Sequence, residues 1–133
     1  MTINNQDDFV RHRVQKAEAT IAEIDSLIEK KFWNTAFKRI YYPCFYVVIA
    51  LLIKNSIKTT THSGTRQQFG RLFIHTGKLD LALGKHYNKL FEKRQRGDYE
   101  DFFDAAEKTV VGFYAPSKEF IKQVIALVNA PLK

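Results

Sequence analysis

The sequence predicts an all-α protein, an up-and-down helical bundle of four long helices plus a short helix. Apolar residues recur three and four positions apart over most of the chain, which is the spacing of one helix face. No stretch alternates apolar and polar residues for long enough to form a strand. No linker or internal repeat divides the 133 residues, so we expect a single helical domain spanning 1–133.

The first two helices are predicted from an apolar stripe and a capping residue. The spacing predicts a first helix over about 6–31, with the stripe Val10, Val14, Ala17, Ile21, Ile24 and Ile28. Asn34 is a plausible N-cap for a second helix that runs to about Lys58, and Pro43 should bend it. Its apolar run over 40–53 is too short to span a bilayer and contains that proline, so we expect a buried core helix and no membrane association.

Capping residues and glycines set the limits of the remaining helices. Thr59–Gly64 reads as a loop, followed by a short helix over about 65–75 that ends at Gly77. Asp80 should cap the fourth helix, which we expect to stop at Gly97. Asp104 and Glu107 match a capping box that opens the fifth helix, and Pro116 should kink or split that helix.

Composition narrows the partners and the compartment. The chain carries 21 Lys and Arg against 14 Asp and Glu, a net charge of +7. That excess favours RNA, nucleotide phosphates or an acidic protein as partners, although a merely solvated basic surface is the alternative. The single cysteine, Cys44, excludes an internal disulfide and suits a reducing compartment. Because the N-terminus begins polar and has no apolar signal core, we expect a cytoplasmic protein.

Familiar catalytic and metal-binding motifs do not occur in the sequence. There is no Gly-rich phosphate loop, HExxH or CxxC, and no nucleophile triad is recognisable. The four histidines, His12, His62, His75 and His86, have no spacing that joins them as metal ligands. We therefore predict no metal and no cofactor, and the polar groups on otherwise apolar helix faces become the candidates.

Arg94 is the first of these candidates. It falls in the middle of the apolar face of the fourth helix, which carries Leu83, Tyr87, Leu90 and Phe91. A buried guanidinium without partners costs several kcal/mol, so Arg94 must be paired, solvated in a cleft or shared with a second subunit. Two interpretations follow. Arg94 and Asp98 form a clamp at the helix end, or Arg94 lies in a cleft and binds phosphate.

Two further groups of side chains have the same ambiguity. Arg39, Tyr42 and Tyr46 form a second stripe on the second helix, which predicts either base stacking or an interface, or a helix packed on both sides. Lys85, Lys89, Lys93 and Arg96 form a basic ridge on the fourth helix. Such a ridge could follow a nucleic-acid backbone, or be a solvated face.

Three blocks of sequence resemble one family in its own order. AFKRIYYPCF, Ala36 to Phe45, is similar to a segment of HEPN domains, the higher-eukaryote and prokaryote nucleotide-binding helical domains. HSGTRQQFGRLFIHTGKLD, from His62, and LFEKRQRGDYEDF, from Leu90, resemble two signatures of a small stand-alone bacterial subfamily. The resemblance covers nearly the whole chain from the first helix onward.

The resemblance implies a dimer, an activity and a partner. HEPN domains usually form homodimers, many are metal-independent ribonucleases of toxin–antitoxin or defence systems, and stand-alone members are often encoded beside a nucleotidyltransferase antitoxin. Arg94 matches the arginine of the family's catalytic motif. The histidine that should follow it is missing, and Asp98 and Tyr99 stand in that region instead. An ordinary aspartate is a poor base near neutral pH. His62 could approach from outside the helix, or it could be only a loop residue near the start of the third helix.

Two hypotheses therefore stand. In the first, the protein is a HEPN ribonuclease or an RNA-binding toxin of a two-component system, with Arg94, Asp98 and Tyr99 as catalytic candidates. In the second, it is a non-catalytic module that binds a nucleotide or a partner protein. For either, the residues expected to bind nucleic acid or nucleotide are Arg39, Tyr42, His62, Lys89, Lys93 and Arg96.

Overall fold

A computed structural model of the chain describes residues 2–99 and 106–131, and the side chains of residues 5–95 and 106–131. It contains α1 (Thr2–Glu29), α2 (Trp33–Lys54), α3 (His62–Phe69), α4 (Leu81–Tyr99) and α5 (Glu107–Asn129). A single π-helical turn, Gly70–Ile74, continues α3 directly. Within the described ranges all regular structure is helical, which confirms the predicted all-α class.

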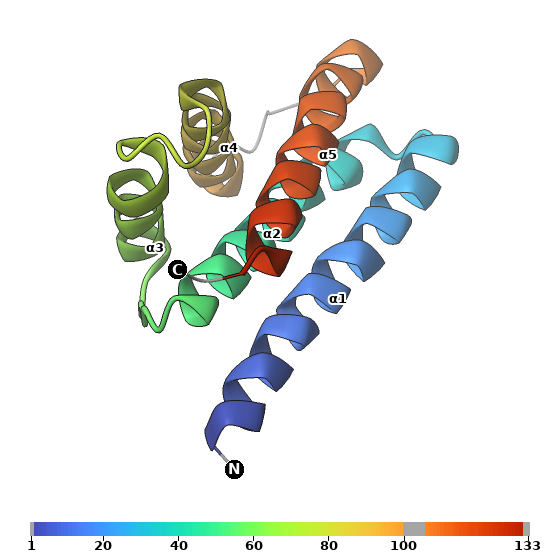
Figure 1. Cartoon of the computed structure of the whole chain (residues 1–133). Helices are drawn as coiled ribbons and strands as arrows, with labels where there is room; N and C mark the ends of the chain where they lie inside the picture. The colour runs from blue at the N-terminus through green and yellow to red at the C-terminus, as the bar shows by residue number, and fades with distance from the viewer. Residues whose placement is uncertain (1, 100–105, 132–133) are drawn as a thin grey trace.

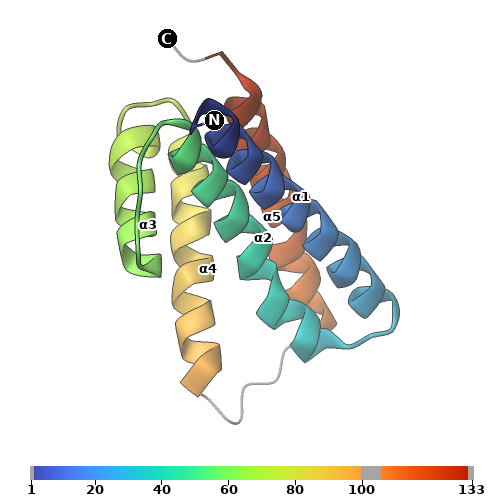
Figure 2. The same ribbon diagram turned by 90° about the horizontal axis from the view of Figure 1, so that it is seen from below.

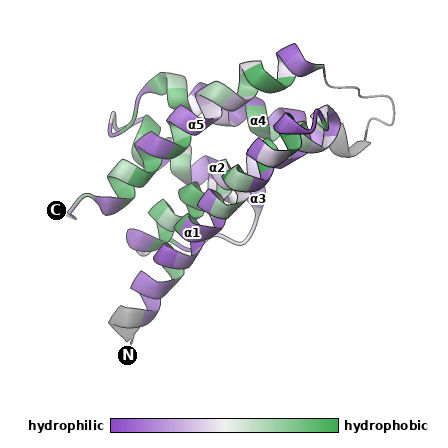
Figure 3. Cartoon of the chain, turned by 90° about the vertical axis from the view of Figure 1, so that its right-hand side faces the viewer, coloured by the Kyte–Doolittle hydropathy of each residue, from purple (hydrophilic) through white to green (hydrophobic). Residues whose placement is uncertain are grey.

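The central helix of the bundle is α2. It packs against α1 on one side and against α5 on another, while α3 and α4 lie together beside it (Figures 1 and 2). The helices carry both hydrophobic and hydrophilic faces, as expected of amphipathic helices that surround a shared core (Figure 3). This arrangement brings α3 and α4 to the same flank of α2, where the candidate site lies.

Aromatic rings from four helices join this flank to the rest of the core. Tyr41 of α2, Phe69 of α3, Tyr87 of α4 and Phe120 of α5 are all nearly fully buried. The ring centroids of Tyr87 and Phe120 lie 5.6 Å apart and stack, and those of Phe69 and Tyr87 lie 5.4 Å apart at a steep angle. Such pairs contribute beyond the area they bury, so the position of α4 against α2 is set by core packing.

The apolar run of the second helix lies mostly inside the protein. By length and composition alone α2 could cross a membrane, but 61% of its most apolar window is buried within the bundle. Pro43 lies inside this helix and is itself buried. Its ring nitrogen cannot donate to the carbonyl of Arg39, one turn earlier in the helix.

Several helix limits differ from the prediction. The first helix ends at Glu29 and the second at Lys54, and each is followed by a non-glycine residue with positive φ, Lys31 at 63° and Ser56 at 62°. After α1, the amide of Phe32 donates to the carbonyl of Leu27, which closes the helix end. No glycine marks these ends, so the predicted limits at Lys31 and Lys58 were too late.

The predicted starts of the second and third helices were also wrong, because other residues cap these helices. Phe32, not Asn34, is the N-cap of α2. The predicted Thr59–Gly64 loop ends early, because the Thr61 hydroxyl accepts from the amide of Gly64 and starts α3 at His62. The fifth helix begins at Glu107 after Ala106 and passes through Pro116 without being split. Asp104, the proposed first residue of its capping box, lies outside the described residues.

The fourth helix is longer than predicted. It begins at Leu81, directly after Asp80, and continues through Gly97 to Tyr99. The prediction that it stops at Gly97 was therefore wrong: a glycine inside a helix costs only about 1 kcal/mol relative to alanine, which need not end it. The segment RQRGDY is helical backbone in its entirety.

Candidate phosphate-binding site around Arg94

Arg94 reaches from α4 onto the surface of α2. Its side chain is half-buried, and its Nε donates a long hydrogen bond of 3.4 Å to the hydroxyl of Tyr42. Its guanidinium carbon lies 5.4 Å from the ring centroid of Tyr41 and 5.6 Å from that of Tyr42. Two phenol rings therefore hold the guanidinium at the edge of the core, with the cation attracted to their faces.

Tyr41 links Arg94 to a histidine from a third helix. Its hydroxyl forms a 2.9 Å hydrogen bond with Nδ1 of His62, the first residue of α3. The His62 ring also stacks on Phe45, with centroids 4.2 Å apart. His62 is therefore linked to Arg94 through Tyr41, and it stands on a helix and not on the predicted loop.

Burial and charge change the acid–base properties of this pair. Burial raises the pKa of Tyr41 above its ordinary value, while the neighbouring Tyr87 hydroxyl and the charge of Arg94 partly oppose that rise. Burial lowers the pKa of His62, and the positive charge of Arg94 lowers it further. At neutral pH the pair is therefore a neutral phenol beside a neutral imidazole, and that imidazole can accept or donate a proton.

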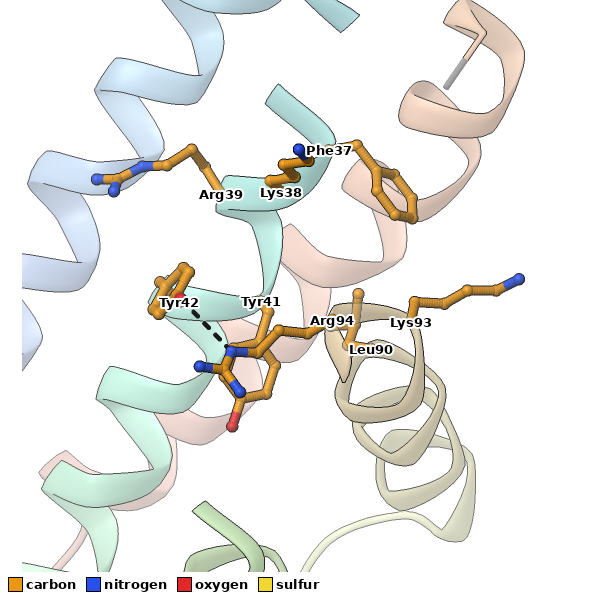
Figure 4. A pocket seen from close by; sticks show the side chains of 8 residues that line it. All are labelled: Phe37, Lys38, Arg39, Tyr41, Tyr42, Leu90, Lys93 and Arg94. Atoms are coloured by element: carbon orange, nitrogen blue, oxygen red, sulfur yellow. Dashed lines mark hydrogen bonds between the residues drawn. The ribbon is translucent and has the colours of Figure 1, made fainter. Parts of the chain in front are cut away.

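A cavity of about 220 Å³ opens beside the guanidinium. In Figure 4 the Arg94 side chain extends from α4 toward Tyr41 and Tyr42, and the dashed line marks its bond to Tyr42. No carboxylate is among the described side chains that line the cavity. The lining residues are Phe37, Lys38, Arg39, Tyr41, Tyr42, Leu90, Lys93 and Arg94.

The other predicted basic residues have different positions. Arg39 lines the cavity, but its guanidinium points toward α1 and forms a 2.7 Å ion pair with Glu23 (Figure 4). Lys93 also lines the cavity, and its side chain extends away from Arg94 (Figure 4). Lys89 is exposed on the outer face of α4, as its place in the ridge predicted. Of the basic residues on α4 whose side chains the structure describes, Arg94 is the one whose side chain contacts both Tyr41 and Tyr42.

The second polar stripe of α2 is partly covered within one chain. Tyr46 is half-buried, and the ammonium of Lys16 from α1 lies 4.9 Å from its ring centroid. Arg39 is likewise paired with α1, and its guanidinium carbon lies 5.9 Å from the ring of Tyr42. The stripe therefore lies along the junction of α1 and α2, with Tyr42 between two arginines.

Three predicted site residues cannot be placed in this geometry. The side chains of Arg96, Asp98 and Tyr99 lie outside the described side chains, although their backbone belongs to α4. The clamp between Arg94 and Asp98 therefore stays a prediction. Because α4 continues through this segment, the two residues are one helical turn apart on the same helix, a spacing at which such pairs interact.

Sequence reasoning missed Tyr41 and Phe45, the residues that connect the site. Tyr41 is 2% exposed and falls within the apolar run, so its pattern resembles an ordinary core position. A phenol in a buried stripe needs a hydrogen-bond partner, and that requirement was the available signal. In the described part of the chain, no three His, Cys, Asp or Glu side chains gather as metal ligands.

Comparison with known proteins decides the family. The sequence model of the HEPN domain family matches residues 10–130 of the chain. This range includes every helix that contributes to the Arg94 site. The chain belongs to the HEPN family. The predicted resemblance, which rested on three separate blocks of sequence, is thereby confirmed.

Relatives of this HEPN chain are found in bacteria and archaea. A UPF0332 protein of Thermotoga maritima is 30% identical over 127 residues, which cover 96% of each chain. A Methanocaldococcus jannaschii protein that bears the name "putative toxin" is 37% identical over 87 residues, 65% of this chain and 59% of its own length. A second protein of that name from the same organism is 28% identical over 86 residues.

Proposed function

We propose that this HEPN protein is the RNA-binding toxin of a two-component system, and that it cleaves RNA without a metal ion. The observation that carries the proposal is the arginine held between Tyr41 and Tyr42 at the wall of a cavity, with the Tyr41 hydroxyl bonded to His62. The toxin names of two relatives support the same assignment.

Arg94 is suited to bind a phosphate group. A guanidinium presents several donors in a planar fork that matches two phosphate oxygens, and it is weakly hydrated compared with an ammonium. The two tyrosine rings orient its plane without neutralising its charge. The exposed side of the cavity is where an RNA backbone would meet it.

His62 supplies the acid–base group that the sequence motif lacks. In this proposal Nδ1–H of His62 donates to the Tyr41 oxygen, which leaves Nε2 free to take the proton of an attacking 2′-hydroxyl. The bond between that oxygen and phosphorus forms, the bond to the 5′-oxygen breaks, and the leaving oxygen takes a proton from water. Arg94 stabilises the charge that develops on the phosphate oxygens.

The proposed test is binding and cleavage of labelled single-stranded RNA in the presence of chelator. Wild type should bind RNA at low salt and lose affinity as salt rises, because phosphate contacts release counterions. Arg94→Ala should weaken binding about tenfold or more, the loss of a charged hydrogen-bonded contact. Arg94→Lys keeps the charge but loses the planar set of donors, so its RNA affinity should lie between those of wild type and Arg94→Ala.

A matched control separates this site from general charge. Arg71 is exposed and bonds only Gln68 among the described residues, so Arg71→Ala removes the same charge from another surface. It should change RNA affinity less than twofold, about the effect of one distant charge in salt. If Arg94→Ala binds RNA as well as wild type, the pocket is not a phosphate site and the non-catalytic, partner-binding hypothesis replaces it.

We also propose that the active form is a homodimer that pairs with a nucleotidyltransferase antitoxin. A two-fold arrangement would bring two Arg94 pockets together and concentrate positive charge, which favours an anionic strand between them. Light scattering should give twice the chain mass across micromolar concentrations. A monomer throughout that range would contradict the dimer, and the absence of a nucleotidyltransferase gene beside this one would weaken the antitoxin assignment.

A further inference from the structure

A second cavity has His62 in its wall. Its volume is about 180 Å³, and its wall combines apolar side chains, hydroxyls and one cation. The described residues that line it include no carboxylate. They are Arg13, Phe45, Ile49, Thr59, Thr60, Thr61, His62 and Thr65.

Arg13 provides the charge of this cavity. It extends from α1 and is half-buried, and its Nε is shielded from solvent without a hydrogen-bond partner in the part of the chain that the structure describes. The shielded Nε is out of reach of a ligand, so a ligand in the cavity would accept from the terminal nitrogens of this guanidinium. Among ligands, an oxyanion meets both the charge and the hydrogen-bonding need.

The threonine rim is ordered by its own hydrogen bonds. The Thr65 hydroxyl donates to the Thr61 carbonyl at 2.8 Å, so the 2.7 Å contact between the Thr59 and Thr65 hydroxyls is donated by Thr59. The Thr61 oxygen accepts from the amide of Gly64 at 2.8 Å, which leaves its own proton available to a ligand. The rim therefore has a fixed shape and a free donor.

Tyr41 and His62 connect this cavity to the Arg94 pocket. Its Nδ1 is bonded to Tyr41, whose ring contacts Arg94, and the same imidazole forms part of the wall beside Arg13. Phe45, on which the imidazole stacks, also lines the second cavity. The hydrogen-bonded pair of Tyr41 and His62 therefore joins the two cavities, with Tyr41 in the wall of the first and His62 in the wall of the second.

We propose that the Arg13 cavity is a second phosphate subsite, which binds a neighbouring phosphate of the RNA strand whose reacting phosphate lies at Arg94. This inference rests on the proposed function, since it assigns a path to the same ligand. With this second subsite the protein should bind a polynucleotide more tightly than a mononucleotide, because only a polynucleotide can contact both Arg94 and Arg13.

The test compares an RNA oligonucleotide with ATP on matched variants. Arg13→Met keeps the buried methylene stem and removes the guanidinium. Arg11→Met removes the same charge two residues away, from an exposed arginine paired with Asp8 at 3.1 Å. We expect Arg13→Met to weaken oligonucleotide binding about five- to tenfold and to lower the salt slope by about 0.7, the share of one phosphate on a single strand. ATP affinity should stay within about twofold, and Arg11→Met should bind both ligands nearly as wild type does.

A second measurement reports on the cavity without RNA. In an NMR titration with inorganic phosphate, the amide resonances of Thr61 and Ser63 should shift in wild type and in Arg11→Met, and the shifts should be lost in Arg13→Met. If oligonucleotide binding is intact and Arg94-dependent but insensitive to Arg13→Met, the subsite is wrong while the proposed function stands. If RNA does not bind wild type but phosphate produces the Arg13-dependent shifts, the cavity is an anion site and the proposed function fails. Absence of phosphate shifts together with equal RNA affinities overturns the subsite.

Discussion

Tyr41 is the residue on which the candidate site depends. Its ring contacts the guanidinium of Arg94, its hydroxyl bonds His62, and its own burial fixes both contacts because the ring cannot rotate away. The two contacts use different parts of one side chain. They can therefore be removed separately, which distinguishes binding by Arg94 from proton transfer by His62.

Tyr41→Phe should separate binding from cleavage. The ring stays over Arg94, so RNA affinity should remain within about twofold, while loss of the hydroxyl frees Nδ1 of His62 and should slow cleavage and alter its pH profile. Tyr41→Leu removes the ring face and should weaken binding about three- to tenfold. Affinity and single-turnover cleavage, measured on the same preparations, check this.

Tyr46→Phe is the control for losing a phenol hydroxyl from α2. The Tyr46 ring contacts Lys16 of α1 and is not among the residues that line either cavity, so neither binding nor cleavage should change by more than about twofold. Equal effects of Tyr41→Phe on affinity and on cleavage would show that the hydroxyl serves the fold and not the positioning of His62.

At the scale of elements, α4 is positioned by a close contact with the π turn that follows α3. A Cβ built at Gly84 would lie 3.0 Å from both Cγ1 and Cγ2 of Ile74, which is too close without a shift. Ile74 is nearly buried and branched at Cβ, so it has little freedom to move. The missing side chain of Gly84 lets α4 approach close enough to place Arg94 over α2.

Two glycine substitutions test this contact against helix propensity. Gly112 lies inside α5 with nothing within 4 Å of a built Cβ, so Gly112→Ala should stabilise the protein by about 0.5–1 kcal/mol. Gly84→Ala gains the same propensity but overpacks Ile74, and should destabilise by about 1 kcal/mol net. Denaturant unfolding of both variants gives the comparison. A stabilising Gly84→Ala would mean that α4 moves away from the turn, and RNA affinity should then fall as well.

For the whole molecule, two histidines couple folding to pH. Burial and the charge of Arg94 lower the pKa of His62, and burial with the charge of Lys89 lowers that of His86, whose Nε2 lies 2.8 Å from the Ser117 hydroxyl. In the unfolded chain both histidines regain their ordinary pKa of about 6.5. Between the folded and unfolded values the unfolded state binds more protons, so stability is greatest above about pH 6.5 and falls as pH drops through the window.

The denaturant midpoint should therefore be lower at pH 5.5 than at pH 7.5. His86→Gln should reduce this difference, because it removes one group that must charge on unfolding. His75→Gln, at an exposed position, is the control and should leave the difference unchanged. A midpoint that is the same at both pH values, or that rises at pH 5.5, would contradict the assignment of two neutral, partly buried histidines.

The sequence alone determined those features of the fold that depend on the spacing of nearby residues. The helical period, the buried faces of α2 and α4, and the position of Arg94 within an apolar stripe all follow from residues within a few turns of one another. Helix limits were less predictable, because Lys31 and Ser56 adopt the left-handed conformation without being glycine, and Gly97 continues a helix that it was expected to end.

The tertiary structure decided which side chains meet Arg94. His62, Tyr41 and Arg94 come from three helices, and no local pattern states that α3 begins at His62 or that α4 lies close enough to α2 for the arginine to reach two tyrosines. The pairing of Arg39 with Glu23 likewise depended on how α1 packs against α2. Such contacts depend on core packing among segments far apart in the chain, and that is the physical reason why the sequence marked Arg94 as unusual but could not name its partners.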